Sequence, residues 1–580
     1  MENVLIQSIL EKMTLRELIG QTAIWHIGRL PFKPNNPDAV SHFLSQNPIG
    51  TIFVADMKSP GDEASVSISD SVSCSQSENF APTGIDMRQY ISDCVACFQN
   101  ASQVPLLVSA DLEHGGGSVA KEFEKFPHMM AIGAANDREL DYLFGKHTAL
   151  EGTSMGINWS FSPVVDLSVN WLNPIVSNRS LGNDPKRVAD AGSAIAAGMQ
   201  EHGMAACAKH FPGDGIDFHD HHICTSVNSL SEEEWYSSYG LIYKQLIDKG
   251  IYSIMLGHIA LPFVDTAVNK KDSYAPATVS KKIVSGLLRE KFGYDGLIIT
   301  DAVDMGAYMG WDTYENCIVD SLNSGVDAVL WPGDTYINTV EKAVADGRLS
   351  KERIVEAVTR IMTLKEKLGI LDKNKNIPSA PVSDATQKES DDTISRIAMK
   401  SISLVRNKDG ILPLDSSKTK RILIGNMSVI TSDRQFPIDL LVSGLKARGV
   451  EVNVLQQCDP IFLRNIKKQI GTLWDALLMP FVLRTHGLIN TVRPVGEAAR
   501  AIWAIQTLDQ LSPIYISFST PYLLCDMPYM QTLVNAYSYN PFSVDATIKA
   551  LFGEIPFNDT PPIHDFYPVG QMENGVKTWR

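Results

Sequence analysis

Between residues 85 and 370 the chain repeats one pattern: a short apolar run, a polar or glycine-rich turn, and an amphipathic stretch with helical spacing. The apolar runs that we interpret as buried strands are 105–110, 157–165, 204–208, 253–256, 297–300 and 326–330. Strands that alternate with helices form parallel sheets, because a crossover returns the chain to the start of the next strand. The pattern therefore predicts an α/β domain, either a (β/α)8 barrel or a doubly wound sheet.

Polar residues follow each of these runs directly. They are Asp111, Asp166, Lys209 with His210, His258, Asp301 and Trp331 with Asp334. In a barrel all strands end at one mouth, whereas a doubly wound sheet concentrates its chemistry at a single switch point. The distribution over six strand ends favours a TIM-like barrel with its functional residues at the mouth.

The pattern changes after residue 370. Residues 371–392 are polar, contain two prolines and carry hardly any large apolar side chain, so we interpret them as a linker that follows a catalytic domain of residues 1–370. Beyond it the runs 422–425, 452–455 and 514–518 resemble buried strands between helical patterns. Residues 393–580 are therefore expected to form a second domain, an αβα sandwich, and it contains no nucleotide-binding fingerprint.

Length and charge narrow the function. A chain of 580 residues exceeds what one hydrophobic core supports. The net charge of −15 argues against nucleic-acid and anionic-membrane partners, since binding phosphate requires a basic face. No apolar run is long enough to span a membrane, and no secretory signal pattern begins the chain, so we expect a soluble cytoplasmic protein. The sequence predicts no oligomeric state.

The densest group of chemical residues is the stretch 209–222, in which four histidines and three aspartates stand near two glycines. Imidazole and carboxylate groups suit a metal, but neighbouring side chains on an extended loop point in different directions and the spacing matches no metal motif. We therefore expect no metal and no other cofactor. Acid–base chemistry fits better, because Asp220 two residues before His222 can share a face with it and stabilise the imidazolium.

Two further groups allow more than one interpretation. Asp301 ends a buried run and is either a helix N-cap or, if Asp304 provides the cap, a nucleophile or electrostatic stabiliser. Lys209 and Arg179 either form buried ion pairs with Asp111 or Glu113 or help these carboxylates to bind the hydroxyls of a sugar. The ion pairs and the sugar site are compatible.

Several motifs coincide with one family. Residues 209–215 (Lys-His-Phe-Pro-Gly-x-Gly) with Asp220-x-His222, residues 178–185 (Asn-Arg-Ser-Leu-Gly-x-Asp-Pro), residues 276–280 (Pro-Ala-Thr-x-Ser) and residues 293–301 (Gly-Tyr-Asp-Gly-x-x-x-Thr-Asp) closely resemble family 3 glycoside hydrolases. More narrowly, residues 13–370 resemble the β-N-acetylglucosaminidase (β-N-acetylhexosaminidase) branch, and the C-terminal part is similar to the αβα sandwich of two-domain members.

The resemblance implies a retaining exo-glycosidase that hydrolyses terminal non-reducing β-linked N-acetylglucosamine through a covalent glycosyl-enzyme. On this basis Asp301 is the nucleophile, and His222, supported by Asp220, is the acid/base. Four residues fall on positions that hold the terminal sugar: Asp111, Arg179, Lys209 and His210. The implied partner is a small carbohydrate.

Asp214 and His221 depart from the branch pattern, which has another histidine and a small residue at these positions. The departures leave the implied acid, nucleophile and sugar clamp in place, and they bear on the aglycone and on the exact sugar. Three alternatives stay open: transfer of the sugar to phosphate by a phosphorylase, action on β-linked glucose or N-acetylgalactosamine, and sugar binding without catalysis.

Overall fold

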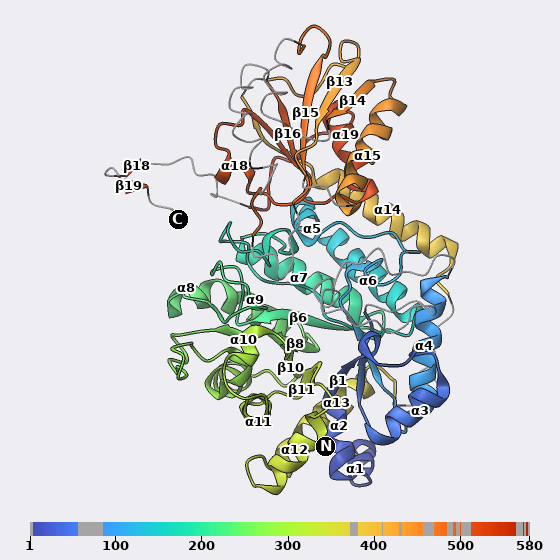
Figure 1. Ribbon diagram of the computed structural model, residues 1–580, viewed down its shortest axis with the longest axis vertical. Coiled ribbons are helices and arrows are strands. Elements are labelled where there is room, and N and C mark those ends of the chain that lie inside the picture. Colours follow the sequence, from blue (N-terminus) through green and yellow to red (C-terminus); the bar gives the residue numbers. More distant parts are fainter. Residues whose placement is uncertain are drawn as a thin grey trace. The chain divides into compact units, whose positions relative to one another are not determined.

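The computed structural model describes residues 4–55, 85–371, 381–408, 410–428, 432–455, 469–483, 491–494, 499, 512–563, 572–573 and 576–577. The chain divides into two compact units (Figure 1). The first comprises Met1–Phe126, Asp141–Asp166 and Ala189–Ser390, and the second comprises Pro127–Leu140, Leu167–Val188 and Asp391–Arg580. Two segments from the N-terminal 370 residues thus group with the second unit.

Eight strands close a barrel in the first unit, in the order β1-β11-β10-β8-β6-β5-β3-β2. Every neighbouring pair is parallel, and β1 pairs with both β11 and β2, which closes the sheet. The strands are β1 (Ala23–His26), β2 (Thr51–Phe53), β3 (Leu107–Ala110), β5 (Trp159–Ser160), β6 (Ala205–Phe211), β8 (Ser253–Leu256), β10 (Leu297–Ala302) and β11 (Ala328–Leu330). The predicted barrel is confirmed, and the doubly wound alternative is wrong.

Helices lie between these strands along the chain, and α3, α4, α11 and α12 lie at the periphery of the barrel (Figure 1). The main helices are α2 (Leu15–Gln21), α3 (Pro37–Gln46), α4 (Met87–Ala101), α6 (Arg138–Ser154), α7 (Pro185–Gln200), α9 (Tyr239–Asp248), α11 (Tyr314–Ser324), α12 (Tyr336–Ala345) and α13 (Lys351–Lys367). Alternate strand residues such as Leu297 and Ile299 join one buried core, while Ile298 between them is also fully buried. Both faces of each strand are covered, which explains the continuous apolar runs in the sequence.

A buried carboxylate with three arginines ties the barrel to its helices. Asp327, directly before β11, contacts Arg289 at 2.5 Å, Arg353 at 3.1 Å and Arg360 at 3.2 Å, and it accepts a hydrogen bond from the Ile298 amide at 3.0 Å. Asp327 itself is fully buried. Removing the charge leaves three guanidinium groups without their shared counter-ion.

We therefore expect Asp327→Asn to lower the free energy of unfolding of the barrel by roughly 3–5 kcal/mol, the usual effect of breaking a buried ion pair. Urea denaturation followed by tryptophan fluorescence measures the change. The exposed Asp346→Asn on the same unit is the matched control and should stay within about 0.5 kcal/mol of the wild type. If the urea unfolding transition of Asp327→Asn coincides with that of the control, the three arginines do not need a charged partner at residue 327.

Lys365 on α13 is fully buried, and its Nζ donates one hydrogen bond to Gln21 Oε1 at 2.8 Å. Burial lowers the pKa of Lys365 from its usual 10.5 to about 7. Between these values the unfolded chain holds a proton that the folded chain has released, so Lys365 makes stability rise with pH across this window. Below pH 7 both states are protonated and burial of the charge costs its full amount.

Lys365→Met should accordingly stabilise the protein at pH 6, by on the order of 2–4 kcal/mol, and lose this advantage as the pH approaches 10. Thermal unfolding of both proteins at pH 6, 8 and 10 tests the prediction, because other titrating groups cancel in the difference. A difference in Tm that does not depend on pH would contradict it.

The second unit contains a six-stranded sheet in the order β12-β17-β16-β15-β13-β14. The strands are β12 (Ser403–Asn407), β13 (Arg421–Gly425), β14 (Glu451–Leu455), β15 (Ala476–Phe481), β16 (Ile514–Ser517) and β17 (Thr532–Asn535), and β12 alone pairs antiparallel. In Figure 1 the strands β13, β14, β15 and β16 lie side by side next to α15 (Ser432–Ala447) and α19 (Pro541–Leu551).

Alternating residues of this sheet enter two separate cores. Ile422 and Ile424 pack with residues of α15 and α19, whereas Leu423 packs on the opposite face with Leu523 and Leu524 of α18 (Leu523–Asp526). Helices therefore cover both faces, which confirms the predicted αβα sandwich. Helix α14 (Asp384–Ser401) begins inside the range predicted as a linker, while residues 372–380 lie outside the described residues.

Candidate functional site

Strand β6 carries the first two residues of the site. The sequence placed Lys209 and His210 in a loop, but β6 continues to Phe211 and includes both. Lys209 Nζ lies 2.6 Å from Asp111 Oδ1 and 2.9 Å from Glu113 Oε1, so the ion pairs considered for this lysine are present. The Lys209 side chain is only 4% exposed, whereas that of Asp111 is 45% exposed. Lys209 thus holds a carboxylate that is open to a ligand.

Asp166, directly after the predicted second strand, organises the start of the loop. Its Oδ2 lies 2.7 Å from His210 Nδ1, and its Oδ1 accepts hydrogen bonds from the amides of His210 at 3.2 Å and Asp214 at 2.8 Å. Asp166 is fully buried. It orients the His210 ring so that Nε2 faces the strand β10.

The loop turns at Gly213, where φ is +113° and a Cβ atom would lie 2.1 Å from the Tyr239 ring. Only glycine fits such a conformation without moving the ring. The Tyr239 hydroxyl donates to the Asp214 carbonyl at 2.5 Å, and the Gly306 amide donates to the His222 carbonyl at 2.8 Å. These contacts anchor the loop at its start and at its end.

Asp220 and His222 form the contact that their spacing predicts. Asp220 Oδ1 lies 2.7 Å from His222 Nδ1 and accepts the His222 amide at 2.9 Å. Asp220 is buried, while the His222 side chain remains 32% exposed. With Nδ1 paired to a carboxylate, His222 presents Nε2 for proton exchange, which is the arrangement that acid–base chemistry requires.

Asp301 stands near the end of β10 and is not a helix cap. Helix α10 (Gly306–Met309) begins after Met305 and has no side-chain cap, so the N-cap interpretation of Asp301 is wrong. Asp304 does not cap it either and instead pairs with Arg29 at 2.6 Å. Asp301 Oδ1 accepts the Ala302 amide at 2.8 Å, and Oδ2 lies 3.9 Å from His210 Nε2.

The imidazoles around Asp301 keep it ionised. Burial alone raises the pKa of this carboxyl, but the positive charges of His210, His221 and two further histidines, His258 and His222, outweigh burial and hold the pKa well below its usual range. Asp301 is therefore a carboxylate throughout the neutral range, as a nucleophile must be.

Two of these histidines, His258 and His221, are fully buried. His258 Nε2 donates to the Ala302 carbonyl at 2.9 Å and its Nδ1 lies 3.0 Å from Thr278 Oγ1, and burial lowers its pKa. His221 lies 3.8 Å from Asp301 Oδ2 through Nε2 and 3.3 Å from Asp214 through Nδ1. Burial, and then the charge of His222, lower the pKa of His221 well below its usual value.

The structure thus brings together six of the seven residues singled out by the sequence on the first unit. Arg179, on the turn Ser177–Arg179, belongs to the second unit, where its guanidinium donates to the Ile175 carbonyl at 3.3 Å. Its place at the sugar site stays a prediction. Asp166 received no role from the sequence, although its position at a strand end was a usable signal, and His221 was left unassigned.

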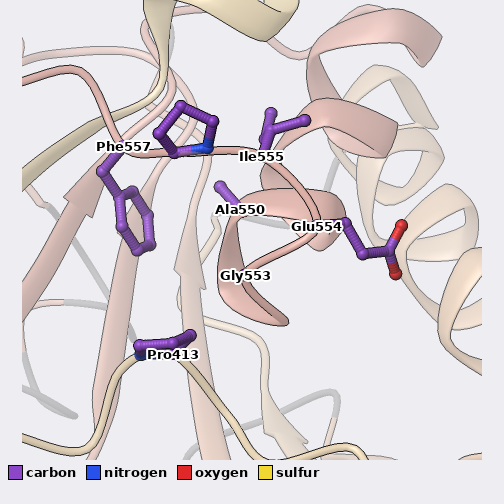
Figure 2. Close-up of a pocket in the computed structure, with 7 residues that line it drawn as sticks. Pro413, Ala550, Gly553, Glu554, Ile555 and Phe557 are labelled. Atoms are coloured by element: carbon purple, nitrogen blue, oxygen red, sulfur yellow. The ribbon is translucent and has the colours of Figure 1, made fainter.

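The second unit has a pocket of its own, of about 410 Å³, shown in Figure 2. Its lining is mostly apolar and comprises Pro413, Ala550, Gly553, Glu554, Ile555, Pro556 and Phe557. The single ionisable group, Glu554, points away from the other side chains and forms a hydrogen-bonded ion pair with Arg448 at 2.9 Å. The one carboxylate in the lining of this pocket is thus paired with an arginine.

Among the described residues, none of the helices is both long and apolar enough to cross a membrane.

Comparison with known proteins agrees with the fold. A β-N-acetylglucosaminidase/β-glucosidase from Cellulomonas fimi is 29% identical over 497 residues, which cover 81% of this chain and 86% of that protein. The solved structure of a β-glucoside phosphorylase bound to 2FGlc is 26% identical, covers 97% of this chain and 96% of that chain, and has a TM-score of 0.83. A family 3 β-N-acetylglucosaminidase from Paenibacillus, at 24% identity, covers 95% of this chain and 99% of that chain with a TM-score of 0.76.

A family model described as the glycosyl hydrolase family 3 N terminal domain matches residues 16–364, more than half of the chain. The family expected from the sequence motifs is therefore confirmed, and the protein is an enzyme of this family. The chain belongs to glycosyl hydrolase family 3.

Proposed function

We propose that this enzyme is a retaining exo-β-glycosidase that releases terminal non-reducing β-linked N-acetylglucosamine. One arrangement carries the proposal: an ionised carboxylate, Asp301, lies near the C-terminal end of β10, and a carboxylate-backed imidazole, His222, lies in the loop after β6. A retaining mechanism requires a nucleophile and a group that both donates and accepts a proton. The two residues supply these functions.

In the first step the Asp301 carboxylate forms a bond to the anomeric carbon while the bond from this carbon to the leaving oxygen breaks. The protonated His222 gives its Nε2 proton to that oxygen, and the aglycone leaves as an alcohol. In the second step the neutral His222 takes a proton from water, the water oxygen bonds to the anomeric carbon, and Asp301 is released as a carboxylate. Asp220 stabilises the imidazolium at the start and end of this cycle.

The terminal sugar is held by the groups on β6 and beside β3. Asp111 exposes its carboxylate next to Lys209, and directional hydrogen bonds from such charged groups suit neutral hydroxyls. His210, fixed by Asp166, lies between this clamp and Asp301. N-acetylglucosamine is proposed as the sugar because the similar Cellulomonas fimi and Paenibacillus proteins are named for it.

Transfer to phosphate is a second candidate. A neutral His222 carries no fixed negative charge, so it does not repel an anionic acceptor in the second step as a glutamate would. A similar solved structure is that of a β-glucoside phosphorylase. Phosphate oxygen would then replace water oxygen in the bond to the anomeric carbon, and the product would be a sugar 1-phosphate.

A panel of aryl β-glycosides of N-acetylglucosamine, glucose and N-acetylgalactosamine, assayed with and without phosphate, tests both candidates. If the enzyme is a hydrolase, turnover should be fastest on the N-acetylglucosaminide and should not change when phosphate is added. The product should be the free sugar, which NMR should show initially as the β anomer. A rate that rises with phosphate and yields sugar 1-phosphate identifies the phosphorylase. No turnover of any aryl glycoside under either condition refutes the proposal.

A further inference from the structure

Three side chains of the site direct ligand atoms at one point. His210, His221 and Asp301 each offer one nitrogen or oxygen atom, and the three atoms lie within 4.8 Å of one another. The Nε2 atoms of the two histidines lie 3.9 Å and 3.8 Å from the same oxygen, Asp301 Oδ2. The side chains come from β6, from the loop after it and from β10, so the fold and not local spacing creates the group.

A carboxylate stands behind each of the two imidazoles. Asp166 Oδ2 lies 2.7 Å from His210 Nδ1, and Asp214 Oδ2 lies 3.3 Å from His221 Nδ1. Histidines that bind metals commonly have a carboxylate at the other ring nitrogen, which orients the ring and makes the ligating nitrogen a stronger base. The His210 ring is held in this manner by a hydrogen-bond contact, whereas Asp214 lies near His221 Nδ1 without a hydrogen bond to it, and both rings have Nε2 toward Asp301.

His221 has a further property that a ligand would satisfy. The residue is fully buried, and among the described residues neither of its ring nitrogens makes a hydrogen bond. A buried polar group without a hydrogen bond costs about 1–3 kcal/mol, so a fully buried imidazole in this state needs an explanation. A metal ion on Nε2 provides one.

We propose that His210, His221 and Asp301 bind one divalent transition-metal ion, with Zn²⁺ as the best match, and that the bound ion inhibits the enzyme by covering the nucleophile. Two imidazoles and one carboxylate are a donor set that Zn²⁺ favours and that the oxygen-seeking Mg²⁺ and Ca²⁺ do not. In a tetrahedral zinc site the ligand atoms lie ~3.3–3.4 Å apart, so the two gaps to Asp301, of 3.9 Å and 3.8 Å, need to close by about half an ångström. All three atoms lie within 4.8 Å of one another, so the gap between the two histidines needs to close by at most about 1.4 Å. The fourth position would hold water.

Metal binding stands on the geometry alone, whereas the inhibition rests on the proposed function of Asp301. Isothermal titration of the full-length protein with ZnCl₂, after treatment with a chelator, measures binding. We expect one equivalent of Zn²⁺ to bind, and we expect turnover of an aryl β-N-acetylglucosaminide to fall with the same midpoint and to return on addition of EDTA. Visible absorption of the Co²⁺-loaded protein then reports whether the ion has imidazole ligands in a tetrahedral site.

Zn²⁺ binding can be compared among variants of the loop that follows β6. His221→Gln should weaken Zn²⁺ binding by at least ~10-fold, and Asp214→Asn, which removes the carboxylate behind His221, by roughly 10-fold or more. His219→Ala is the matched control, because His219 lies on the same loop with a carboxylate, Asp217, 2.7 Å from its Nδ1, yet is exposed and outside the group. It should bind Zn²⁺ as the wild type does and keep its activity.

Each outcome separates the two proposals. An unchanged Zn²⁺ affinity in folded His221→Gln, or no binding to the wild type, overturns the metal site, whatever the activity. Binding that depends on His221 in a protein that turns over no glycoside supports the metal site and counts against the proposed function. Binding at His221 that leaves turnover of an active enzyme unchanged overturns the inhibitory role.

Discussion

Asp301→Asn is expected to lower kcat/KM on an aryl β-N-acetylglucosaminide by roughly 10³-fold or more, because the amide is neutral and a poor nucleophile. The surroundings of Asp301 sharpen this expectation. The pKa of the carboxyl lies well below its usual range, so Asp301 is ionised at neutral pH, and its Oδ1 is fixed by the Ala302 amide. The substitution keeps the shape of the side chain and removes only the charge that attacks the anomeric carbon.

The matched control is Asp304→Asn, three residues along the chain. Asp304 lies at the same strand end, but it pairs with Arg29 and is half exposed. It should keep most of its activity. Intact-protein mass spectrometry after reaction with an activated fluoro-sugar should show one added sugar on the wild type and none on Asp301→Asn. Turnover within a few-fold of the wild type in Asp301→Asn would remove Asp301 from the mechanism.

The barrel could be predicted because its strands are covered on both faces. The runs that predict β8, β10 and β11 are rich in apolar residues, and they mark these strands to within two residues. Strand β5, by contrast, is only Trp159–Ser160 within a predicted run of nine residues, and β1 (Ala23–His26) was missed. Very short strands leave little periodic pattern, so their existence depends on the closure of the whole sheet.

In the site, too, some contacts could be predicted from the sequence and others could not. The Asp220–His222 contact could be predicted, since it joins residues two positions apart whose spacing already places them on one face. The partners of His210 could not be predicted, because Asp166 reaches it from the segment after β5 and Asp301 reaches it from β10. Parallel strands bring their C-terminal ends together, but which side chains then meet depends on register. His221 shows this most clearly, since its position one residue before His222 gives no sign that it faces the nucleophile.

The role of His222 should appear in how strongly the loss of kcat/KM in a His222 variant depends on the leaving group of the substrate. His222→Ala removes the proton donor, so it should lower kcat/KM by ~10²–10⁴-fold for a substrate with a poorly acidic alcohol as aglycone, such as a chito-oligosaccharide. An aryl glycoside with an acidic phenol leaves without protonation, so its first step should be much less affected. The second step should then limit the rate, because nothing activates water.

A small anion distinguishes this role from a loss of structure. Azide needs no deprotonation, so it should attack the glycosyl-enzyme of His222→Ala, raise the turnover of the activated aryl glycoside and yield a glycosyl azide. Asp220→Asn should keep part of the activity with a changed pH profile, since the imidazole remains but loses its charged partner at 2.7 Å. A variant in which poor and good leaving groups suffer equally, and which azide does not restore, would assign His222 to positioning the loop and leave the proton to another group.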